Sequence, residues 1–306
     1  MTEDALVGNH VVDKIRRRRL LEETTSPLPE HTRIITVSNQ KGGVGKTTTT
    51  VNLASALARR GANVLVIDMD PQGNASTALG VHHRPEVTSI YDVLLGEQSI
   101  DDALQPTTDH ENLFCVPSTI HLAGAEIELV SLVAREQRLR TALESFLSES
   151  ERTYHYVFID CPPSLGLLTV NAFVAAREVL IPIQTEYYAL EGLSQLLGNI
   201  QLIQKHLNPV LQVSTILLTM YDARTNLAQE VALEVRNHFP TQVLNTVVPR
   251  SVRISEAPSY GQTVHAYDPA SIGALAYLEA AADIAQRGVR HASTQTDAPA
   301  TPDEGA

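Results

Sequence analysis

The stretch NQKGGVGKTTTT, residues 39–50, decides the fold of this chain. It follows the apolar run 34–37, which is typical of a β-strand, and it leads into the helical pattern of residues 48–61. A glycine-rich turn between a strand and a helix points successive backbone N–H groups inward, and the helix N-terminus adds its dipole. Because the turn ends in Gly-Lys-Thr, we interpret it as a phosphate-binding loop rather than an ordinary strand-to-helix turn.

Each residue of this loop has an expected role. Lys46 is placed to reach the β- and γ-phosphates of a nucleotide, and Thr47 to offer its hydroxyl to Mg²⁺. The strict pattern has glycine where this chain has Gln40, and Lys41 is a second lysine that the pattern does not require. The other residues expected to surround the nucleotide are Gly42, Gly43, Val44, Gly45 and Thr48.

Two acidic segments each follow a hydrophobic strand. Asp68 and Asp70 belong to the segment VIDMDPQGNAS, and Asp160 belongs to YVFIDCPPSLG. Ligands of open α/β sheets bind at the carboxyl edge of the strands, where carboxylates can order water and metal ions. We expect Asp160 to hold the hydration shell of Mg²⁺ and Asp68 to support the site or to contact a Mg²⁺-bound water. The alternative for Asp68 and Asp70 is that both only cap the turn after their strand.

Short β-rich runs alternate with longer helical stretches along the chain. The runs VLVID and YVFID are apolar throughout, as in strands that are buried on both faces of a parallel sheet. We therefore predict an α/β fold with a doubly wound, mostly parallel sheet flanked by helices. Further strands are predicted within 112–118, 178–186, 213–222 and 244–251, and a helix at 189–207.

The chain is expected to divide into three parts. Residues 1–31 are charged and end in a proline-bearing linker, which predicts a basic, flexible extension. Residues 32–287 hold all of the strand and helix patterns and form the folded domain. Residues 288–306 are small, polar and proline-bearing, which predicts a disordered tail.

Composition excludes several classes of protein. The formal net charge of −12 means that any nucleic-acid contact must come from a local basic patch. No apolar stretch approaches the roughly 18 residues that cross a bilayer, and the N-terminus lacks the pattern of a secretory signal, so we expect a cytoplasmic protein. Cys115 and Cys161 lie far apart in the sequence, which argues against a zinc site, an iron–sulfur cluster or a disulfide framework.

The form KGGVGKT resembles the deviant Walker A motif of the ParA/MinD/nitrogenase-iron-protein superfamily, which implies a P-loop NTPase of the SIMIBI type. A wider resemblance, over roughly residues 33–287, is to chromosome-partitioning ATPases of the ParA/Soj type. It rests on VIDMDPQGNAS, STIHLAGAEIELV, FIDCPPSLGLLTVNA, EYYALEGLSQLL, LLTMYDARTNL and VPRSVRISEAPSYG. The resemblance implies slow hydrolysis of ATP to ADP and phosphate, with ATP and Mg²⁺ as cofactors.

The resemblance also assigns catalytic roles. In that superfamily the extra lysine, here Lys41, reaches the phosphates bound by the partner subunit of a nucleotide-sandwich dimer, alongside the subunit's own Lys46. The second aspartate of the D-x-D-P-Q-G-N motif, here Asp70, orients or activates the attacking water. From their places after predicted strands, Met220 and Pro249 are expected to flank the adenine ring.

In the ParA/Soj family the ATP-bound homodimer binds double-stranded DNA without sequence preference. Arg224 and Arg253 match the arginines that the family uses for this contact, and Arg250 lies beside the second. The resemblance further implies a ParB-like partner that stimulates hydrolysis, and a cytoplasmic, nucleoid-associated protein with no membrane contact.

Lys14 and the run 16–19 form a second basic cluster. A solvated helical face explains it, and an auxiliary contact to DNA or to a partner is the alternative.

Three alternative functions make different demands on the sequence. A MinD-like positioning ATPase needs a C-terminal amphipathic helix, and APATPDEGA has no such face. A nitrogenase-iron-protein relative needs cysteine pairs for its cluster. A scaffold that is gated by nucleotide and does not hydrolyse it would not need Asp70 and Asp160.

Overall fold

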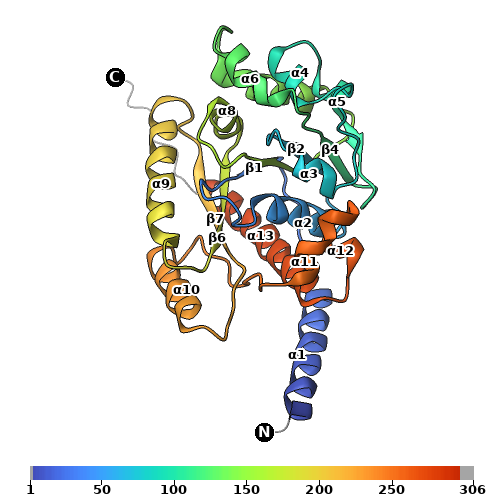
Figure 1. The fold of residues 1–306 in the computed structure, drawn as a ribbon, viewed down its shortest axis with the longest axis vertical. Helices are drawn as coiled ribbons and strands as arrows, with labels where there is room; N and C mark the ends of the chain where they lie inside the picture. Colours follow the sequence, from blue (N-terminus) through green and yellow to red (C-terminus); the bar gives the residue numbers. More distant parts are fainter. Residues whose placement is uncertain (1–2, 297–306) are drawn as a thin grey trace, which may run out of the picture.

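One seven-stranded sheet organises the chain (Figure 1). The structure is a computed structural model that describes the backbone of residues 3–296 and the side chains of residues 12–288. The strand order is β3-β4-β2-β5-β1-β6-β7, and every neighbouring pair is parallel except β3 and β4. The predicted doubly wound, mostly parallel sheet is therefore confirmed. The strands are β1 (Arg33–Val37), β2 (Val64–Asp68), β3 (Gln105–Pro106), β4 (Leu113–Val116), β5 (Tyr156–Asp160), β6 (Glu178–Gln184) and β7 (Gln212–Thr219).

Helices cover both faces of the sheet (Figure 1). In β2, Val64 and Val66 pack toward α2 and α13, whereas Leu65 and Ile67 pack toward the side of α7, α8 and α9. Successive strand residues point to opposite faces, so a strand covered on both faces needs apolar residues throughout. The α-helices are α1 (Glu3–Glu23), α2 (Lys46–Ala58), α3 (Asn74–Ala78), α4 (Ile90–Leu95), α5 (Ile100–Ala103), α6 (Leu122–Leu129), α7 (Arg138–Glu149), α8 (Leu167–Ala175), α9 (Ala189–His206), α10 (Asn226–His238), α11 (Val252–Glu256), α12 (Val264–Tyr267) and α13 (Ile272–Thr296). Two 3₁₀ turns, η1 (Arg135–Gln137) and η2 (Ala257–Tyr260), complete the elements.

The strand register brings the sequence motifs to one edge of the sheet. β5 lies between β2 and β1, and Asp160 is paired in register with both Asp68 and Val37. The phosphate-binding loop leaves the sheet directly after Val37, and α2 follows it. The loop and the two acidic segments are therefore neighbours at the carboxyl edge, as expected for a ligand site in this class of fold.

Residues 244–251 do not form the predicted strand. They follow the edge of β7 without a continuous ladder: the backbone N–H of Val248 donates to the carbonyl of Leu218 (2.8 Å), and Pro249 forms an isolated bridge with Tyr221. Proline has no N–H to donate, which limits a ladder at this position. The edge strand β3 was not predicted either, because its two residues carry no β-rich pattern.

The N-terminal extension is a helix where we expected a flexible segment. Helix α1 packs on α13 through Leu21, which is 9% exposed and contacts Leu275 and Ala282. Arg17 adds a bidentate ion pair with Glu279 (2.6 and 2.8 Å). A single buried leucine gives too sparse an apolar pattern for periodicity to reveal a docked helix.

The C-terminal boundary also lies later than predicted. α13 continues to Thr296, whereas the predicted tail begins at residue 288. The first proline after this helix is Pro299, so no strong helix breaker ends it at residue 287. The remainder of the predicted tail, 297–306, lies outside the described residues.

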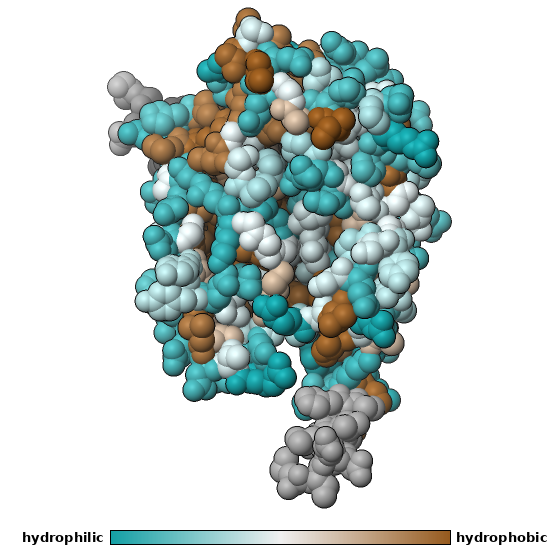
Figure 2. All heavy atoms as spheres, in the orientation of Figure 1, coloured by the Kyte–Doolittle hydropathy of each residue, from teal (hydrophilic) through white to brown (hydrophobic). Residues whose placement is uncertain are grey.

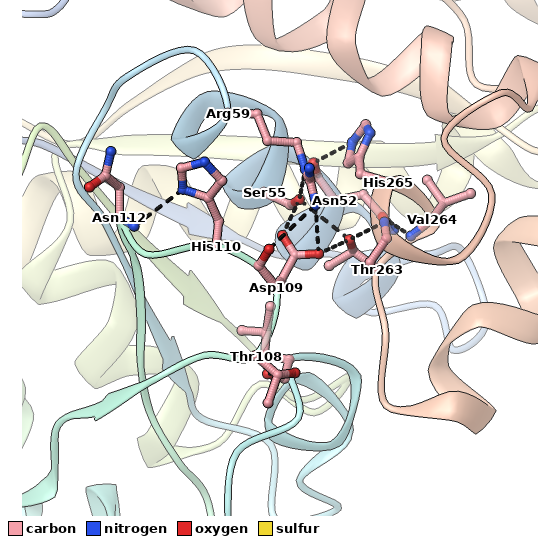
Figure 3. A network of polar contacts seen from close by, with 12 residues as sticks. Asn52, Ser55, Arg59, Thr108, Asp109, His110, Asn112, Thr263, Val264 and His265 are labelled. Atoms are coloured by element: carbon pink, nitrogen blue, oxygen red, sulfur yellow. Dashed lines mark hydrogen bonds and ion pairs between the residues drawn. The ribbon is translucent and has the colours of Figure 1, made fainter.

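A buried polar network joins α2 to the segment around α12 (Figure 3). At its centre is Asp109, whose side chain is 2% exposed and pairs with Arg59 (3.3 Å). Its carboxylate accepts hydrogen bonds from the hydroxyls of Ser55 and Thr263, both at 2.5 Å. A buried carboxylate is costly unless it is paired and hydrogen-bonded, and this one is both. The network therefore holds three segments distant in sequence together.

Asn52 of α2 extends this network to α12. Its side-chain oxygen accepts from the backbone N–H of Val264 (2.8 Å), and its carbonyl faces Nε2 of His265 (3.1 Å). A carbonyl can only accept, so the Nε2 atom must carry the proton. Burial lowers the pKa of His265 from 6.5 to about 4, with Arg59 acting in the same direction and Asp109 against it.

The pKa of His265 predicts that acid destabilises the fold. The unfolded chain takes up a proton on this histidine below pH 6.5, while the folded chain resists it down to about pH 4. Stability from this group is therefore complete above about pH 6.5 and is lost as the pH falls toward 4. Between pH 7 and pH 5 the free energy of unfolding should fall by about 2 kcal/mol more in the wild type than in His265→Gln.

Urea denaturation at the two pH values measures this difference. His206→Gln, which changes an exposed histidine of α9, is the matched control and should retain the wild-type pH dependence. An unchanged pH dependence in His265→Gln would contradict the assignment.

Candidate functional site

The loop between β1 and α2 forms an open cradle of backbone donors. Gly43 and Gly45 have φ angles of +75° and +88°, a left-handed conformation that side chains disfavour. Above Gly42 and Gly43 there is open space. Within the described part of the chain, the backbone N–H groups from Gly42 to Thr48 donate no hydrogen bond. This geometry, at the start of α2, is that of an anion site.

Lys46 is the first residue of α2 and is only 8% exposed. Its ammonium group donates to the carbonyl of Lys41 (3.2 Å), so the side chain folds back over the loop. Burial lowers the pKa of Lys46, and the carboxylate of Asp160 opposes this shift. The lysine is therefore held within the cradle beside a carboxylate.

Asp160, the last residue of β5, is fully buried and held by two threonine hydroxyls. Thr47 donates to Oδ2 (2.7 Å) and Thr50 donates to Oδ1 (3.0 Å). Burial, together with the neighbouring Asp68, raises the pKa of Asp160 to about 8. A buried carboxylate in contact only with hydroxyl donors is a site at which a cation would be stabilised.

Asp68 and Asp70 occupy different environments. Both oxygens of Asp68 are taken up by the following turn: Oδ2 accepts from the backbone N–H (2.8 Å) and hydroxyl (2.7 Å) of Ser76, and Oδ1 accepts from the N–H of Asp70 (3.2 Å). Burial raises the pKa of Asp68 to about 6. Asp70 accepts one bond, from the N–H of Gln72 to Oδ1 (3.0 Å). For Asp68 these bonds match the alternative that it caps the turn after its strand, and the Mg²⁺ contact stays a prediction.

The surroundings of the loop fit a polyphosphate and Mg²⁺. The carboxylates of Asp68, Asp70 and Asp160 lie close enough to repel one another electrostatically. The ammonium group of Lys46 attracts Asp160 and Asp70. Among the described residues no three His, Cys, Asp or Glu side chains form a metal cage. Mg²⁺ at phosphate sites keeps several waters and uses few protein ligands, so Thr47 and a water-mediated Asp160 suit it.

Lys41 points away from the cradle that its own loop forms. Its ammonium group pairs with Oε1 of Glu186, in the connection between β6 and α9, and both side chains are partly exposed. Its backbone N–H donates to the side chain of Asn39 (3.0 Å), which is anchored to the carbonyl of Pro182 (2.8 Å). The loop backbone is thus fixed to β6, while the side chain of Lys41 lies at the surface.

Met220 lies near the loop, and Pro249 lies in the neighbouring segment that follows the edge of β7. Met220 follows β7, has a φ of +51°, and its Cε atom is 3.9 Å from the position that a Cβ on Gly45 would take. The preceding residue, Thr219, donates its hydroxyl to the carbonyl of Val44 (2.8 Å). Pro249 bridges to the residue after Met220. Met220 is therefore close to the nucleotide loop, and Pro249 is placed by its bridge to Tyr221.

The three candidate arginines lie on the surface, outside the cradle. The side chain of Arg224 is 88% exposed and pairs with Asp222 (2.8 Å). Its hydrogen bond holds the pKa of Asp222 at about 2, and Arg250 adds to this effect, so Arg224 and Arg250 are neighbours. Arg253 pairs instead with two acids, Glu256 (3.2 Å) and Asp268 (3.5 Å).

Comparison with known proteins identifies the family. A family model described as an AAA domain matches residues 32–213. The sporulation initiation inhibitor protein Soj of Bacillus subtilis is 53% identical over 256 residues, which cover 84% of this chain and 99% of Soj. The chain belongs to the ParA/Soj family of chromosome-partitioning ATPases. The chromosome partitioning protein ParA of Myxococcus xanthus, another family member, is 51% identical over 83% of this chain and 88% of its own length.

Solved structures place the ParA/Soj fold among related ATPases. A cobyrinic acid a,c-diamide synthase from Mycobacterium smegmatis, with a bound ATP analogue and magnesium, is 36% identical with a TM-score of 0.70, covering 89% of this chain and all of that one. The cell division ATPase MinD of Pyrococcus furiosus is 29% identical with a TM-score of 0.68, covering 83% of this chain and 99% of MinD. No helix among the described residues is long and apolar enough to span a membrane.

Most of the residues predicted for this ParA/Soj site lie together in the structure. The loop, Asp70 and Asp160 come together at one sheet edge, and Met220 lies against the loop. Thr50 was missed because four consecutive threonines give no sign of which hydroxyl faces the acid. Glu186 was missed because only the fold brings it to Lys41. The arginines remain separate from the nucleotide loop.

Proposed function

We propose that this ATPase binds Mg·ATP in the cradle of residues 41–48, pairs with a second copy, and binds DNA in that state. The observation that carries the proposal is a run of backbone N–H groups with no acceptor among residues 3–296, in a loop that also holds the buried Lys46 and contacts the buried Asp160 through Thr47. Hydrolysis then ends the paired state. The reaction is phosphoryl transfer to water.

The residues of one chain divide the work. Lys46 and the loop N–H groups neutralise the charge of the β- and γ-phosphates, and Thr47 with Asp160 would hold Mg²⁺. Bound Mg²⁺ supplies further charge neutralisation on the leaving group. Of the three aspartates at this edge, Asp70 is the one with an oxygen, Oδ2, that no donor among the described residues contacts. We assign to it the orientation of the attacking water. Catalysis of this type consists mainly of positioning and electrostatic stabilisation.

Pairing of two copies gives Lys41 its role. Because Lys41 points away from its own cradle toward Glu186, it is available to a second chain once that ion pair opens. Hydrophobic side chains gather over α6, at the upper end of the molecule in Figure 2, where Ile127 is 80% exposed. Leu165, five residues after Asp160, is exposed as well. A patch of this kind is typical of an interaction surface, and we propose that a second copy covers it.

Arg224, Arg250 and Arg253 are the proposed contacts to double-stranded DNA. The net charge of −12 requires a local patch, and no base-reading motif accompanies these arginines, so binding is expected to be independent of sequence. Dimerisation doubles the number of phosphate contacts, which links affinity for DNA to ATP. A ParB-like partner would stimulate hydrolysis and release the protein from the nucleoid.

A gel-shift series on a nonspecific duplex, with ATP, ADP or no nucleotide, tests the function. Retention only with ATP is expected. Equal retention in all three conditions would contradict a nucleotide-dependent DNA contact. If a separate assay shows no ATP hydrolysis in the presence of DNA and the partner, the nonhydrolysing scaffold is favoured instead.

Replacing both Arg224 and Arg253 with alanine is expected to abolish retention on DNA at physiological salt while ATP-dependent dimerisation persists. Each lost phosphate contact lowers the salt slope by about 0.9, so four contacts in a dimer would lower it by about 3.6. Sedimentation measures the dimer, and fluorescence anisotropy measures DNA binding.

The matched control is Arg84→Ala/Arg140→Ala, which removes the same charge from two exposed arginines elsewhere. Arg140 is ion-paired with Glu144 (2.9 Å), much as Arg224 is paired with Asp222. Equal loss of DNA binding in both double variants would point to net charge rather than to a defined patch.

A further inference from the structure

Helix α1 lies outside the part of the chain that the family model matches, which begins at residue 32. It extends from the lower end of the molecule in Figure 1, below α11 and α12. The ATPase site does not use it. The helix is nevertheless docked on the body of the protein and carries a basic cluster, so it presents a basic surface in a fixed position.

Three contacts fix α1 to the body of the protein. Leu21 is buried against α13, and Arg17 forms the bidentate pair with Glu279. Arg18 donates to the carbonyl of Pro269, in the turn that precedes α13. These contacts lie on one side of the helix, so the opposite side is left to solvent.

The docked helix lies next to the segment that carries two of the candidate DNA-binding arginines. Arg17, Pro249 and Ile272 line the same cavity of about 410 Å³, and Arg250 follows Pro249 directly. On the other side, Arg18 contacts the residue after Asp268, the partner of Arg253. The docking side of α1 therefore adjoins the segments that carry Arg250 and Arg253.

The cluster holds cations that no side chain in the described part of the chain neutralises. Between Lys14 and Arg19 the helix carries five cations and no carboxylate. Arg17 and Arg18 are used in docking. The side chains of Lys14, Arg16 and Arg19 form no ion pair or hydrogen bond with any other described residue. In contrast, Arg224 and Arg253 form ion pairs with nearby acids.

We infer that α1 extends the DNA-binding surface, with Arg16 and Arg19 contacting the phosphates of a duplex that also lies on Arg250 and Arg253. This inference rests on the proposed DNA binding of the ATP-bound dimer. Phosphate contacts require cations that are free and positioned on a common surface, and they carry no sequence preference. An overall acidic protein has the greatest need of such an addition.

A duplex fits this surface better than a membrane does. Val12, Ile15 and Leu20 are exposed on α1. On a helical projection, however, Arg19 falls between Ile15 and Val12, and Arg16 falls between Val12 and Leu20. A helix that lies in a membrane interface separates an apolar face from a charged one, and α1 interrupts its apolar side chains with arginines.

The variant Arg16→Gln/Arg19→Gln tests the inference in the full-length protein with Mg·ATP. Its affinity for a nonspecific duplex should fall roughly tenfold or more, and the salt slope should fall by about 1.8 per protomer. ATP turnover without DNA and ATP-dependent dimerisation should not change. The matched control is Arg84→Gln/Arg140→Gln, which removes two exposed arginines elsewhere and should leave the slope near that of the wild type.

The outcomes separate this inference from the proposed function. If the wild type does not bind DNA with ATP, the proposed function fails. If the wild type binds and the α1 variant keeps the same slope, only the inference about α1 is overturned. An equal drop in slope for the control would overturn it too. A second arm uses vesicles of phosphatidylglycerol: if the α1 variant loses vesicle binding while its DNA slope is unchanged, the helix serves a membrane instead.

Discussion

Replacing Lys46 with alanine is expected to abolish the binding of Mg·ATP. The ammonium group is buried within the cradle, and in the nucleotide complex it would donate to phosphate oxygens at a place where water cannot substitute for it. Hydrogen bonds to charged groups contribute about 1.5–3 kcal/mol each, so the loss of two such contacts lowers affinity by a factor of 100 or more, at about 1.4 kcal/mol per factor of ten. Isothermal titration calorimetry measures the affinity of the variant for Mg·ATP.

Lys41→Ala is the matched control, five positions earlier in the same loop. Since Lys41 is paired with Glu186 and points out of its own cradle, a single chain should bind ATP with an affinity within about threefold of the wild type, as expected for an exposed ion pair. The same variant should fail to dimerise with ATP. Normal ATP affinity in Lys46→Ala would refute the assignment of the phosphate-binding loop.

Replacing Asp70 with alanine is expected to lower ATP turnover by about 10²- to 10⁴-fold, the usual contribution of a positioned acid–base group, and to trap the ATP-bound dimer on DNA. Asp70 sits at the sheet edge beside Lys46, and its Oδ2 has no donor among the described residues. Asp68 and Asp160, in contrast, have both oxygens engaged. Asp70 is therefore the carboxylate that remains available to a water molecule.

Phosphate release in the presence of DNA measures the turnover of this variant, and a pull-down on immobilised duplex measures the trapped dimer. Asp70→Asn keeps the oxygen that accepts from Gln72 and removes the charge, so it separates the carboxylate from the shape of the turn. Both variants should be slow. An Asp70→Ala protein that hydrolyses ATP at the wild-type rate would remove Asp70 from this role.

The sheet edge could be predicted from the sequence because each of its parts carries a local signal. A buried parallel strand is apolar along its whole length, and the acid that ends it stands out, as Asp68 and Asp160 do. The loop adds glycines that only a special backbone requires. Neighbouring parallel strands then bring these ends to one edge, so local patterns were enough to predict that the loop and the acids meet.

Other features depend on contacts between distant segments, which no local pattern reveals. The docking of α1 uses one leucine and two arginines, and the partner of Arg17 lies far along the chain at Glu279. The segment 244–251 has the composition of a strand, yet it pairs only intermittently with β7. In both cases tertiary contacts outweigh the local preference.

The ion pair between Lys41 and Glu186 affects the protein concentration at which two chains dimerise. An exposed pair of this kind contributes about 0–1 kcal/mol, and two such pairs open when two chains meet, so the association constant changes by no more than about thirtyfold. Such a pair cannot keep two ATP-loaded chains apart. It can set the threshold concentration at which they assemble, so that assembly occurs where the protein has accumulated and not where it is dilute.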